Sequence, residues 1–348
     1  MSESNSARLA GALVLFLFVS VECNSQNTVN SSIRFMFYNV ENLFDINDDP
    51  LTDDYEFTSQ GTRHWNYTRY VRKLNSLYKA LIASGEWEPP AVIGLCEIEN
   101  KKVLSDLLNK TYLSKYNYKI IHQDSPDPRG IDVCMLFRDA LVKVDTFIYY
   151  NINSIESETF LTRNMLYVKL IVYKDTINLF INHWPSRRGG VLAAEPQRKK
   201  IAEFLRAKLD SLYFTSARNC NLILMGDFNA SPDDEVIKML TKNYNSGLVM
   251  VNLCESVKQG SGSYRYQGKW EIIDQIIISS NFLDGEKNLI ATEKNFKIIN
   301  NEFLLTDDPV YPGKTPYSTW RGFKYQGGFS DHLPVILDLK IRHSALSE

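Results

Sequence analysis

Short, almost continuously apolar runs recur along this chain, and most of them end in a polar residue. The run AVIGLCE at 91–97 and the run NLILM at 221–225 are examples. Such runs are typical of strands that are covered on both faces. They therefore predict sheets buried inside a layered fold. The predicted strands are 33–40, 91–97, 118–121, 132–137, 141–150, 165–173, 177–182, 221–225, 272–279 and 333–341.

Helical patterns separate some of these strands. Apolar residues recur at helical spacing over 65–84 and 191–213, and a short helix is predicted at 104–108. Many strands with few helices favour two packed sheets flanked by helices, in a single α/β (α+β) domain over 33–343. The segment 306–328 is rich in Pro, Gly and Tyr, which predicts a surface loop.

The first residues are expected to lie outside this domain. An apolar run of 13 residues, 9–21, follows Arg8 and is too short to span a bilayer comfortably. It has the length of the apolar region of a secretory signal, so residues 1–23 are predicted to be a signal peptide or lipoprotein signal, followed by a polar linker at 24–32. Cys23 could carry a lipid anchor, although Glu22 is a poor neighbour for that modification. The predicted location is outside the cytoplasm: secreted, periplasmic or anchored to the outer membrane of a bacterium. An uncleaved anchor is the alternative.

The overall charge of the chain does not indicate a polyanionic partner. The chain has 39 Lys and Arg against 41 Asp and Glu, a formal net charge of −2. A basic patch on one face remains open, because net charge averages over all faces. The apolar share of 44% and charged share of 23% exclude a disordered chain or a membrane protein with several spans.

Polar residues gather at the ends of the predicted strands. One acid at a strand end is ordinarily a turn or cap residue, but strand ends of layered sheets can converge on one rim. Several carboxylates there would repel each other unless a cation held them, and oxygen ligands suit Mg²⁺ or Mn²⁺. The strand-end residues are Asn39, Glu41, Glu97, Asn182, His183, Asp227, Asn229, Asp274, Ser330, Asp331 and His332.

The order of these motifs resembles the endonuclease/exonuclease/phosphatase superfamily, which includes pancreatic-type deoxyribonucleases and abasic-site endonucleases. The motifs are N-x-E, a strand-end E, N-H, G-D-x-N, I-D and S-D-H, and they cover roughly residues 33–341. The pair G-D-F-N and S-D-H-x-P is specific, whereas N-x-E alone is weak. The resemblance implies a four-layer sandwich of two mainly antiparallel sheets, with the active site on one rim.

The resemblance implies a metal site made of oxygen ligands. Glu97 would be the principal ligand of Mg²⁺ or Mn²⁺. Asn39 and Glu41 would position the metal and the phosphate, and Asp331 would be a further ligand or a nearby supporting carboxylate.

The resemblance also implies roles in hydrolysis. Asp227 would align or deprotonate the attacking water, and Asn229 would hold that water or a phosphoryl oxygen. His183 would stabilise the negative charge that develops on phosphorus or protonate the leaving oxygen. Asp274 would hydrogen-bond His332 and fix its tautomer. Asp227, a metal-bound hydroxide and the Asp274–His332 pair remain alternative general bases.

Three segments near these motifs have the composition of substrate contacts. Arg187 and Arg188 stand beside a Gly-Gly pair, which suits phosphate oxygens. Tyr264 and Arg265 lie in an aromatic–cationic run that suits nucleic acid, and Arg129 lies in a P-R-G-I-D stretch similar to one bordering the site in secreted relatives. Solvated arginines and core aromatics are the ordinary alternatives.

Departures from the motifs of two branches of the superfamily make membership of those branches less expected. Ala230 and Gln275 stand where inositol-polyphosphate phosphatases carry arginine, and no apolar aromatic hairpin of the sphingomyelinase type is evident. We therefore expect a metal-dependent phosphodiester hydrolase, most simply a nuclease, that works as a monomer without an obligate protein partner. A phosphatase or phosphodiesterase of small phosphoesters or lipid head groups is the alternative enzyme. A non-catalytic binding protein on the same scaffold is the alternative from another class.

Overall fold

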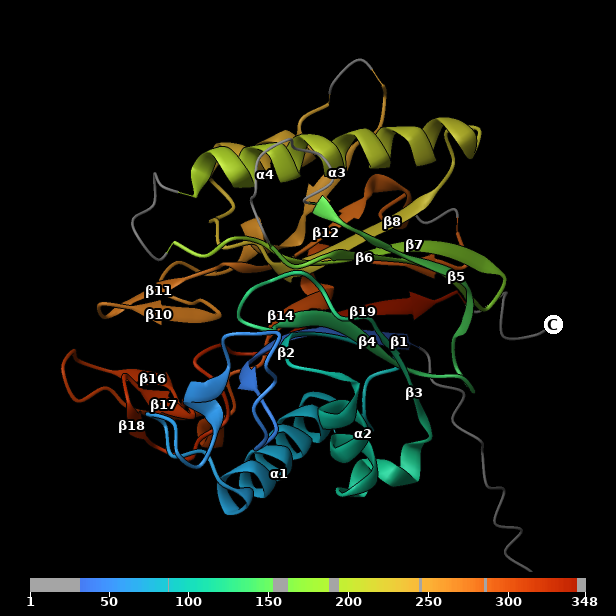
Figure 1. The fold of residues 1–348 in the computed structure, drawn as a ribbon. Coiled ribbons are helices and arrows are strands. Elements are labelled where there is room, and N and C mark those ends of the chain that lie inside the picture. Colours follow the sequence, from blue (N-terminus) through green and yellow to red (C-terminus); the bar gives the residue numbers. More distant parts are fainter. Residues whose placement is uncertain are drawn as a thin grey trace, which may run out of the picture. The chain divides into compact units, whose positions relative to one another are not determined.

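A computed structural model describes residues 32–342 except 87, 153–161, 188–193, 244–245 and 285–286 (Figure 1). The chain divides into two units, Met1–Asn30 and Ser31–Glu348, and only the second contains described residues. The predicted signal at 1–23 and nearly all of the linker at 24–32 lie outside the described residues. Ser32, the last predicted linker residue, is the first residue of strand β1. Within the described ranges, no helix has the length and apolarity that crossing a bilayer requires.

The first sheet contains seven strands in the order β13-β19-β1-β2-β4-β3, with β14 also paired to β19. Only β1 and β2 are parallel neighbours, and the other pairs are antiparallel. The strands are β1 (Ser32–Leu43), β2 (Val92–Ile98), β3 (Tyr118–His122), β4 (Asp132–Arg138), β13 (Leu289–Ile290), β14 (Phe296–Ile298) and β19 (Val335–Ile341).

The second sheet contains six strands in the order β5-β6-β7-β8-β12-β9. Here β7 and β8 are the parallel pair, and their neighbours are antiparallel. The strands are β5 (Lys143–Tyr150), β6 (Met165–Val172), β7 (Asp175–His183), β8 (Asn221–Asp227), β9 (Met250–Asn252) and β12 (Asp274–Ser279).

Alternate residues of each central strand enter different cores. In β1, Phe35 and Phe37 pack between the two sheets, whereas Met36 and Tyr38 pack under helices α1 (Tyr67–Ser84) and α2 (Lys101–Asn109). This alternation follows from the two-residue period of a strand, and it explains why the runs are apolar throughout. A third core joins the second sheet to α3 (Glu195–Thr215) and α4 (Glu235–Thr241).

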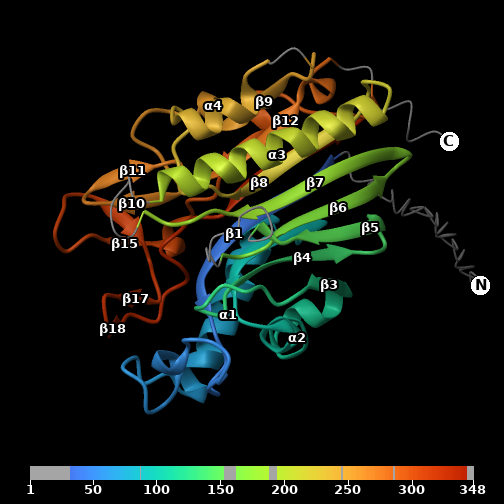
Figure 2. The same cartoon turned by 45° about the horizontal axis from the view of Figure 1, so that its top comes forward.

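These packing relations confirm the predicted four layers, with α1 and α2 on one outer side and α3 and α4 on the other (Figures 1 and 2). Helix α1 begins at Tyr67 because Asn66 caps it by accepting from Arg69 N at 3.1 Å. The short helical turns are Tyr55–Phe57, Tyr112–Tyr116, Leu253–Ser256, Ser280–Phe282, Glu293–Asn295 and Glu302–Leu304.

The prediction of a plain loop at 306–328 is wrong in part, because this segment contains strands of two hairpins. Sheet pairing joins β15 (Leu305–Asp307) to β16 (Lys314–Pro316), and β17 (Trp320–Arg321) to β18 (Lys324–Tyr325). The hairpin of β10 (Tyr264–Tyr266) and β11 (Lys269–Glu271) was equally absent from the predicted strands. Strands of two or three residues are too short to show an alternating pattern.

Candidate active site

The polar strand ends meet at one pocket of about 500 Å³. The sheet registers bring them together: His183 at the end of β7 pairs with Asp227 at the end of β8, and Asp227 pairs with Asp274 at the start of β12. Three residues that are 44 or more positions apart in sequence thus form one row. The pocket is lined by Asn39, Glu97, Arg129, His183, Ser186, Arg187, Asp227, Asn229, Tyr264, Tyr266, Glu271, Ile273, Asp331 and His332.

Irregular backbone directs the ends of β1 and β2 at this pocket. The β1–β2 register shifts between Asn39 and Leu43, and the β2–β4 register shifts between Cys96 and Ile98. Glu97 lies at the second shift with φ +63, a left-handed conformation that is costly for a residue other than glycine. A bulge of this kind re-aims a side chain, here the carboxylate of Glu97.

The glycine of the G-D-F-N motif is required by the close approach of two strands. A Cβ at Gly226 would lie 2.4 Å from the backbone oxygen of Asn182 in β7. The adjacent Asp227 could not keep its register against His183 if these strands were forced apart.

Asp227 is the centre of the polar contacts in the pocket. Its Oδ2 accepts from Asn39 Nδ2 at 3.1 Å, and its Oδ1 accepts from Asn229 N at 2.9 Å. The Nε2 atoms of His183 and His332 lie 3.7 and 3.9 Å from Oδ2. Burial, with the neighbouring charge of Asp274, raises the pKa of Asp227 to about 7, although His332 opposes the rise. This carboxylate can therefore exchange a proton near neutral pH.

His332 and Asp274 form the predicted pair. His332 Nδ1 lies 2.7 Å from Asp274 Oδ2, and both side chains are buried. Burial alone would lower the pKa of His332, but Asp274, Asp331 and Asp227 outweigh it and raise this pKa well above its ordinary value. His332 is therefore a cation at neutral pH. The Tyr264 ring packs against the imidazole with centroids 4.8 Å apart.

Arg163 is a buried site residue that the sequence reasoning missed. Its Nε donates to His183 Nδ1 at 3.2 Å, and another guanidinium nitrogen lies 3.0 Å from His183 Nε2. A guanidinium only donates, so at least one imidazole nitrogen must be unprotonated. Burial and the charges of Arg163 and Arg129 accordingly lower the pKa of His183 far below its ordinary value. A lone Arg two residues before β6 gave no motif that could have revealed it.

Asp127 holds Arg163 from the other side. Its Oδ2 accepts from Arg163 Nη1 at 3.1 Å, and its Oδ1 accepts from Arg129 N at 2.9 Å and lies 3.5 Å from Arg129 Nε. One carboxylate thus lies between two arginines, which leaves this corner of the pocket net positive. The predicted site residue Arg129 lines the pocket from this corner.

Replacing Arg163 with methionine should lower the free energy of unfolding by about 3 kcal/mol, because Asp127 would remain as a buried charge without its main partner. Adding Asp127→Asn should restore most of that stability but not the hydrolytic rate. Urea unfolding at pH 7 and kcat/KM on one substrate give the two readouts. If the double variant is no more stable than the single variant, the buried pair does not have this role.

Glu97 and Asp331 are the carboxylates that best suit a cation. Glu97 Oε2 accepts from Asn42 N at 3.0 Å, which leaves Oε1 for another partner, and Oε1 lies 3.9 Å from His183 Nε2. Burial and the charge of Glu97 raise the pKa of Asp331, whereas His332 and Lys73 oppose the rise. Two neighbouring carboxylates with negative charge offer the oxygen donors that a hard divalent cation prefers.

Another set of donor atoms lies across the same pocket. The ligand atoms of Asp227, Asp274 and His332 all lie within 4.8 Å of one another. His332 is protonated at neutral pH and has no nitrogen free for a cation, so this set offers only Asp227 and Asp274. Asp274 Oδ2 already binds His332 Nδ1, while its Oδ1 has no hydrogen-bond partner among the described residues. The Glu97–Asp331 position therefore remains the better candidate.

The predicted metal ligand Glu41 is placed differently. Its two carboxylate oxygens accept from the backbone amides of Thr319 and Trp320, and it does not line the pocket. Lys73 of α1 lies behind it, with Nζ donating to Thr319 Oγ1 and to Phe329 O. Glu41 thus supports the 319–320 segment, and its predicted help in positioning the metal, partly through water, stays a prediction.

The predicted arginine contacts also change. Arg187 lines the pocket, but its guanidinium donates to Asn229 O at 2.9 Å and to Glu271 Oε2 at 2.8 Å. Arg265 does not line it; its guanidinium donates to the carbonyls of Pro312 and Lys314, which corrects the predicted substrate contact. The guanidinium groups of both arginines are thus engaged in hydrogen bonds within the protein. Arg188 lies outside the described residues.

Comparisons with known proteins agree with this architecture. Residues 34–341 match the profile described as Endonuclease/Exonuclease/phosphatase family. A search of curated proteins gave no match.

Solved structures share the fold at low identity. Humanized D. rerio TDP2 with 14 mutations is 14% identical, with TM-score 0.55, covering 89% of this chain and 99% of that one. An endonuclease/exonuclease/phosphatase protein of Bacteroides vulgatus is 15% identical, with TM-score 0.54 and coverages of 89% and 99%. The human Nocturnin catalytic domain is 16% identical, with TM-score 0.53 and coverages of 90% and 95%.

These identities establish the fold alone, whereas the profile match extends over nearly the whole described domain. The chain therefore belongs to the endonuclease/exonuclease/phosphatase family, whose members are phosphoester hydrolases.

Proposed function

We propose that this protein is a divalent-metal-dependent phosphodiesterase that cleaves nucleic acid by in-line attack of water on phosphorus. The observation that carries the proposal is the position of Asp227. Its Oδ2 lies within 4 Å of Asn39, His183 and His332, which come from β1, the end of β7 and the residues before β19. Such convergence supplies an acceptor for the proton of water and donors for phosphoryl oxygens at one point.

The electrostatics favour Asp227 as the general base among the alternatives. A base is most effective when its pKa lies near the working pH, and Asp227 has a pKa of about 7. His332 is already protonated at neutral pH, so it suits donation to a phosphoryl or leaving oxygen. His183 is neutral, so positive charge on its side of the pocket comes from Arg163 and Arg129. Asn229, whose side-chain Nδ2 donates a hydrogen bond to Trp184 O, borders the same point.

A divalent cation, when bound, would polarise the phosphoryl oxygens and favour ionisation of water. Glu97 and Asp331 would hold it, with the amide oxygen of Asn39 on the same rim. Cys and His ligands at zinc spacing are absent from this sequence, which supports a hard cation such as Mg²⁺ or Mn²⁺.

Two tyrosines favour nucleic acid over an isolated phosphate. Tyr264 and Tyr266 line the pocket on β10, and Tyr266 is 55% exposed. Exposed aromatic rings beside a phosphate site are suited to stacking with bases. A pocket of about 500 Å³ also admits a small phosphoester of nucleotide size, which keeps the small-substrate alternative as the second candidate.

A substrate panel tests the function and its metal dependence together. The panel consists of bis-(p-nitrophenyl) phosphate, plasmid, single-stranded DNA and RNA, each assayed with Mg²⁺ or Mn²⁺. We expect the protein to cleave at least one of the nucleic acids. Excess EDTA should abolish turnover, and added Mg²⁺ or Mn²⁺ should restore it, because Glu97 and Asp331 alone supply no positive charge. Full activity in EDTA would falsify the metal requirement. Turnover of small esters without cleavage of any nucleic acid would favour the second candidate.

A further inference from the structure

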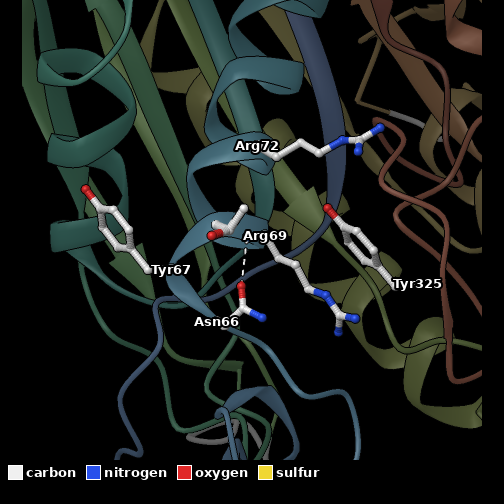
Figure 3. Close-up of a pocket in the computed structure, with 6 residues that line it drawn as sticks. Asn66, Tyr67, Arg69, Arg72 and Tyr325 are labelled. Atoms are coloured by element: carbon white, nitrogen blue, oxygen red, sulfur yellow. Dashed lines mark hydrogen bonds between the residues drawn. The ribbon is translucent and has the colours of Figure 1, made fainter.

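A second pocket, of about 570 Å³, lies on the outer helical layer that contains α1 (Figure 3). It is lined by Asn66, Tyr67, Thr68, Arg69, Arg72 and Tyr325. Arg69 and Arg72 are three positions apart in α1 and therefore project from the same face of the helix. Tyr325, from the β17–β18 hairpin, lies between their guanidinium groups in this view. Tyr67 lies on the opposite side of α1 from these groups.

Among the described residues, the two arginines keep donors that no protein group accepts. Arg69 Nη1 donates to the carbonyls of Arg63 and His64, and Arg72 Nε donates to Gly327 O at 3.1 Å. These partners are neutral carbonyls, so neither positive charge is neutralised by them. Among the ion pairs of the described residues, the neighbouring Arg63 pairs with Glu56 at 3.0 Å, and none involves Arg69 or Arg72.

The aromatic part of the surface is pre-organised. The guanidinium carbon of Arg69 lies 4.5 Å from the ring centroid of Tyr325, which also packs against Trp320 at 5.2 Å. Phe323, in the turn of the same hairpin, is 69% exposed, with Arg63 lying 5.5 Å from its ring. Rigid aromatic rings interleaved with arginines are the features by which proteins bind bases and phosphates of single strands.

This surface is connected to the active site through one short segment. Residues 319–332 begin at the β17–β18 hairpin and end at Asp331 and His332, which line the catalytic pocket. Both views place β17–β18 at the same side of the domain as β10–β11, which carries Tyr264 and Tyr266 (Figures 1 and 2). Lys73, next to Arg72, ties this segment down through Phe329 O at 2.6 Å.

We propose that Arg69, Arg72 and Tyr325 bind a single-stranded nucleic-acid segment that flanks the scissile phosphodiester. Each of the two guanidinium groups contacts one backbone phosphate, on either side of Tyr325, and a base stacks on the aromatic surface that Tyr325 and the exposed Phe323 form. The inference rests on the proposed function for its substrate, and it adds a second contact that a small phosphoester cannot reach.

The test is binding, measured apart from turnover. Fluorescence anisotropy of a labelled 15-nucleotide oligothymidylate in EDTA gives the Kd of wild type, Arg72→Gln and the double variant Arg69→Gln/Arg72→Gln. We expect the double variant to raise Kd about tenfold and to reduce the slope of log Kd against log salt by ~1.4, since each single-strand phosphate contact contributes about 0.7. Arg72 is exposed, so Arg72→Gln alone should fold normally and lose about half of that slope. Arg72→Lys should keep most of the slope.

Lys143→Gln is the matched control. Lys143 is an exposed residue at the start of β5, paired with Ile171 and thus at the sheet end opposite His183. Equal losses in this control, or unchanged binding in the arginine variants, overturn the proposal. Binding to phosphatidylglycerol vesicles that depends on the arginines, with oligonucleotide binding that does not, also overturns it in favour of a lipid surface.

Turnover of bis-(p-nitrophenyl) phosphate separates this inference from the proposed function. Arg72→Gln should cleave this small ester at the wild-type rate, because Arg72 does not line the catalytic pocket. A wild type inactive on every ester refutes the enzyme, whereas an active wild type with arginine-independent oligonucleotide binding refutes this surface alone.

Discussion

Asp227→Asn should reduce kcat about 10²–10⁴-fold while leaving the protein folded. The substitution removes the acceptor for the proton of water, and positioned general bases contribute rate factors of this size. The amide is nearly isosteric, so the contacts from Asn39 and Asn229 require little rearrangement. One of these two donors would face the new NH₂ group, which costs about 1 kcal/mol. Initial rates on bis-(p-nitrophenyl) phosphate, with thermal unfolding of the same preparation, provide the measurement.

The stability of the same variant should depend on pH in a defined direction. The folded-state pKa of Asp227, about 7, lies above the ordinary value of 3.8, so the folded state binds the proton more tightly than the unfolded state does. The contribution of Asp227 to stability is therefore greatest below about pH 4 and is lost as the pH rises toward 7. Asp227→Asn removes this dependence. Its melting temperature should rise relative to wild type between pH 4 and pH 7, and the difference should persist at pH 8.

Asp139→Asn provides a matched acid-to-amide control, because Asp139 is exposed and its ion pair among the described residues is with Lys119 at 3.6 Å. It should change neither rate nor the pH dependence of melting. Near wild-type turnover by a folded Asp227→Asn protein would remove Asp227 from the mechanism and, with it, the observation on which the proposed function rests.

The Asp274–His332 pair should act as one unit. Asp274→Asn and His332→Gln should each reduce kcat by about 10²–10⁴-fold, and the double variant should be little slower than either. The reason is that Asp274 contributes through His332: it supplies the 2.7 Å partner and the negative charge that keep the imidazole protonated and oriented. A double-mutant cycle on one substrate measures this coupling.

The pH profile distinguishes this role from a purely structural one. Without the carboxylate of Asp274, burial of His332 is less well opposed and its pKa should fall. Asp274→Asn should therefore move the alkaline limb of the kcat profile, where His332 loses its proton, to lower pH than in wild type. Additive losses, or a variant profile parallel to that of wild type, would show that the pair serves folding.

Local patterns made much of the fold predictable. The apolar runs marked the long strands because both faces of each sheet are covered, as Phe35 and Met36 show by entering different cores. The short hairpins of 305–325 were missed, since strands of two or three residues have no period to detect. Export of the protein stays a prediction from the 13-residue run, as residues 1–31 lie outside the described part of the chain.

By itself, the sequence determined which strands end in polar residues and that these residues suit phosphodiester chemistry. Asp227 and Asp274 were identifiable because each directly adjoins an apolar run. Only the tertiary structure decided how they act, because register and burial arise from contacts between distant segments. It showed that Glu97 lines the pocket, whereas the oxygens of Glu41 accept from backbone amides. It also showed that Arg265 donates to a backbone carbonyl outside the pocket. It also placed Arg163, which no motif marks, on His183. Burial and this guanidinium keep His183 neutral, whereas Asp274 keeps His332 charged.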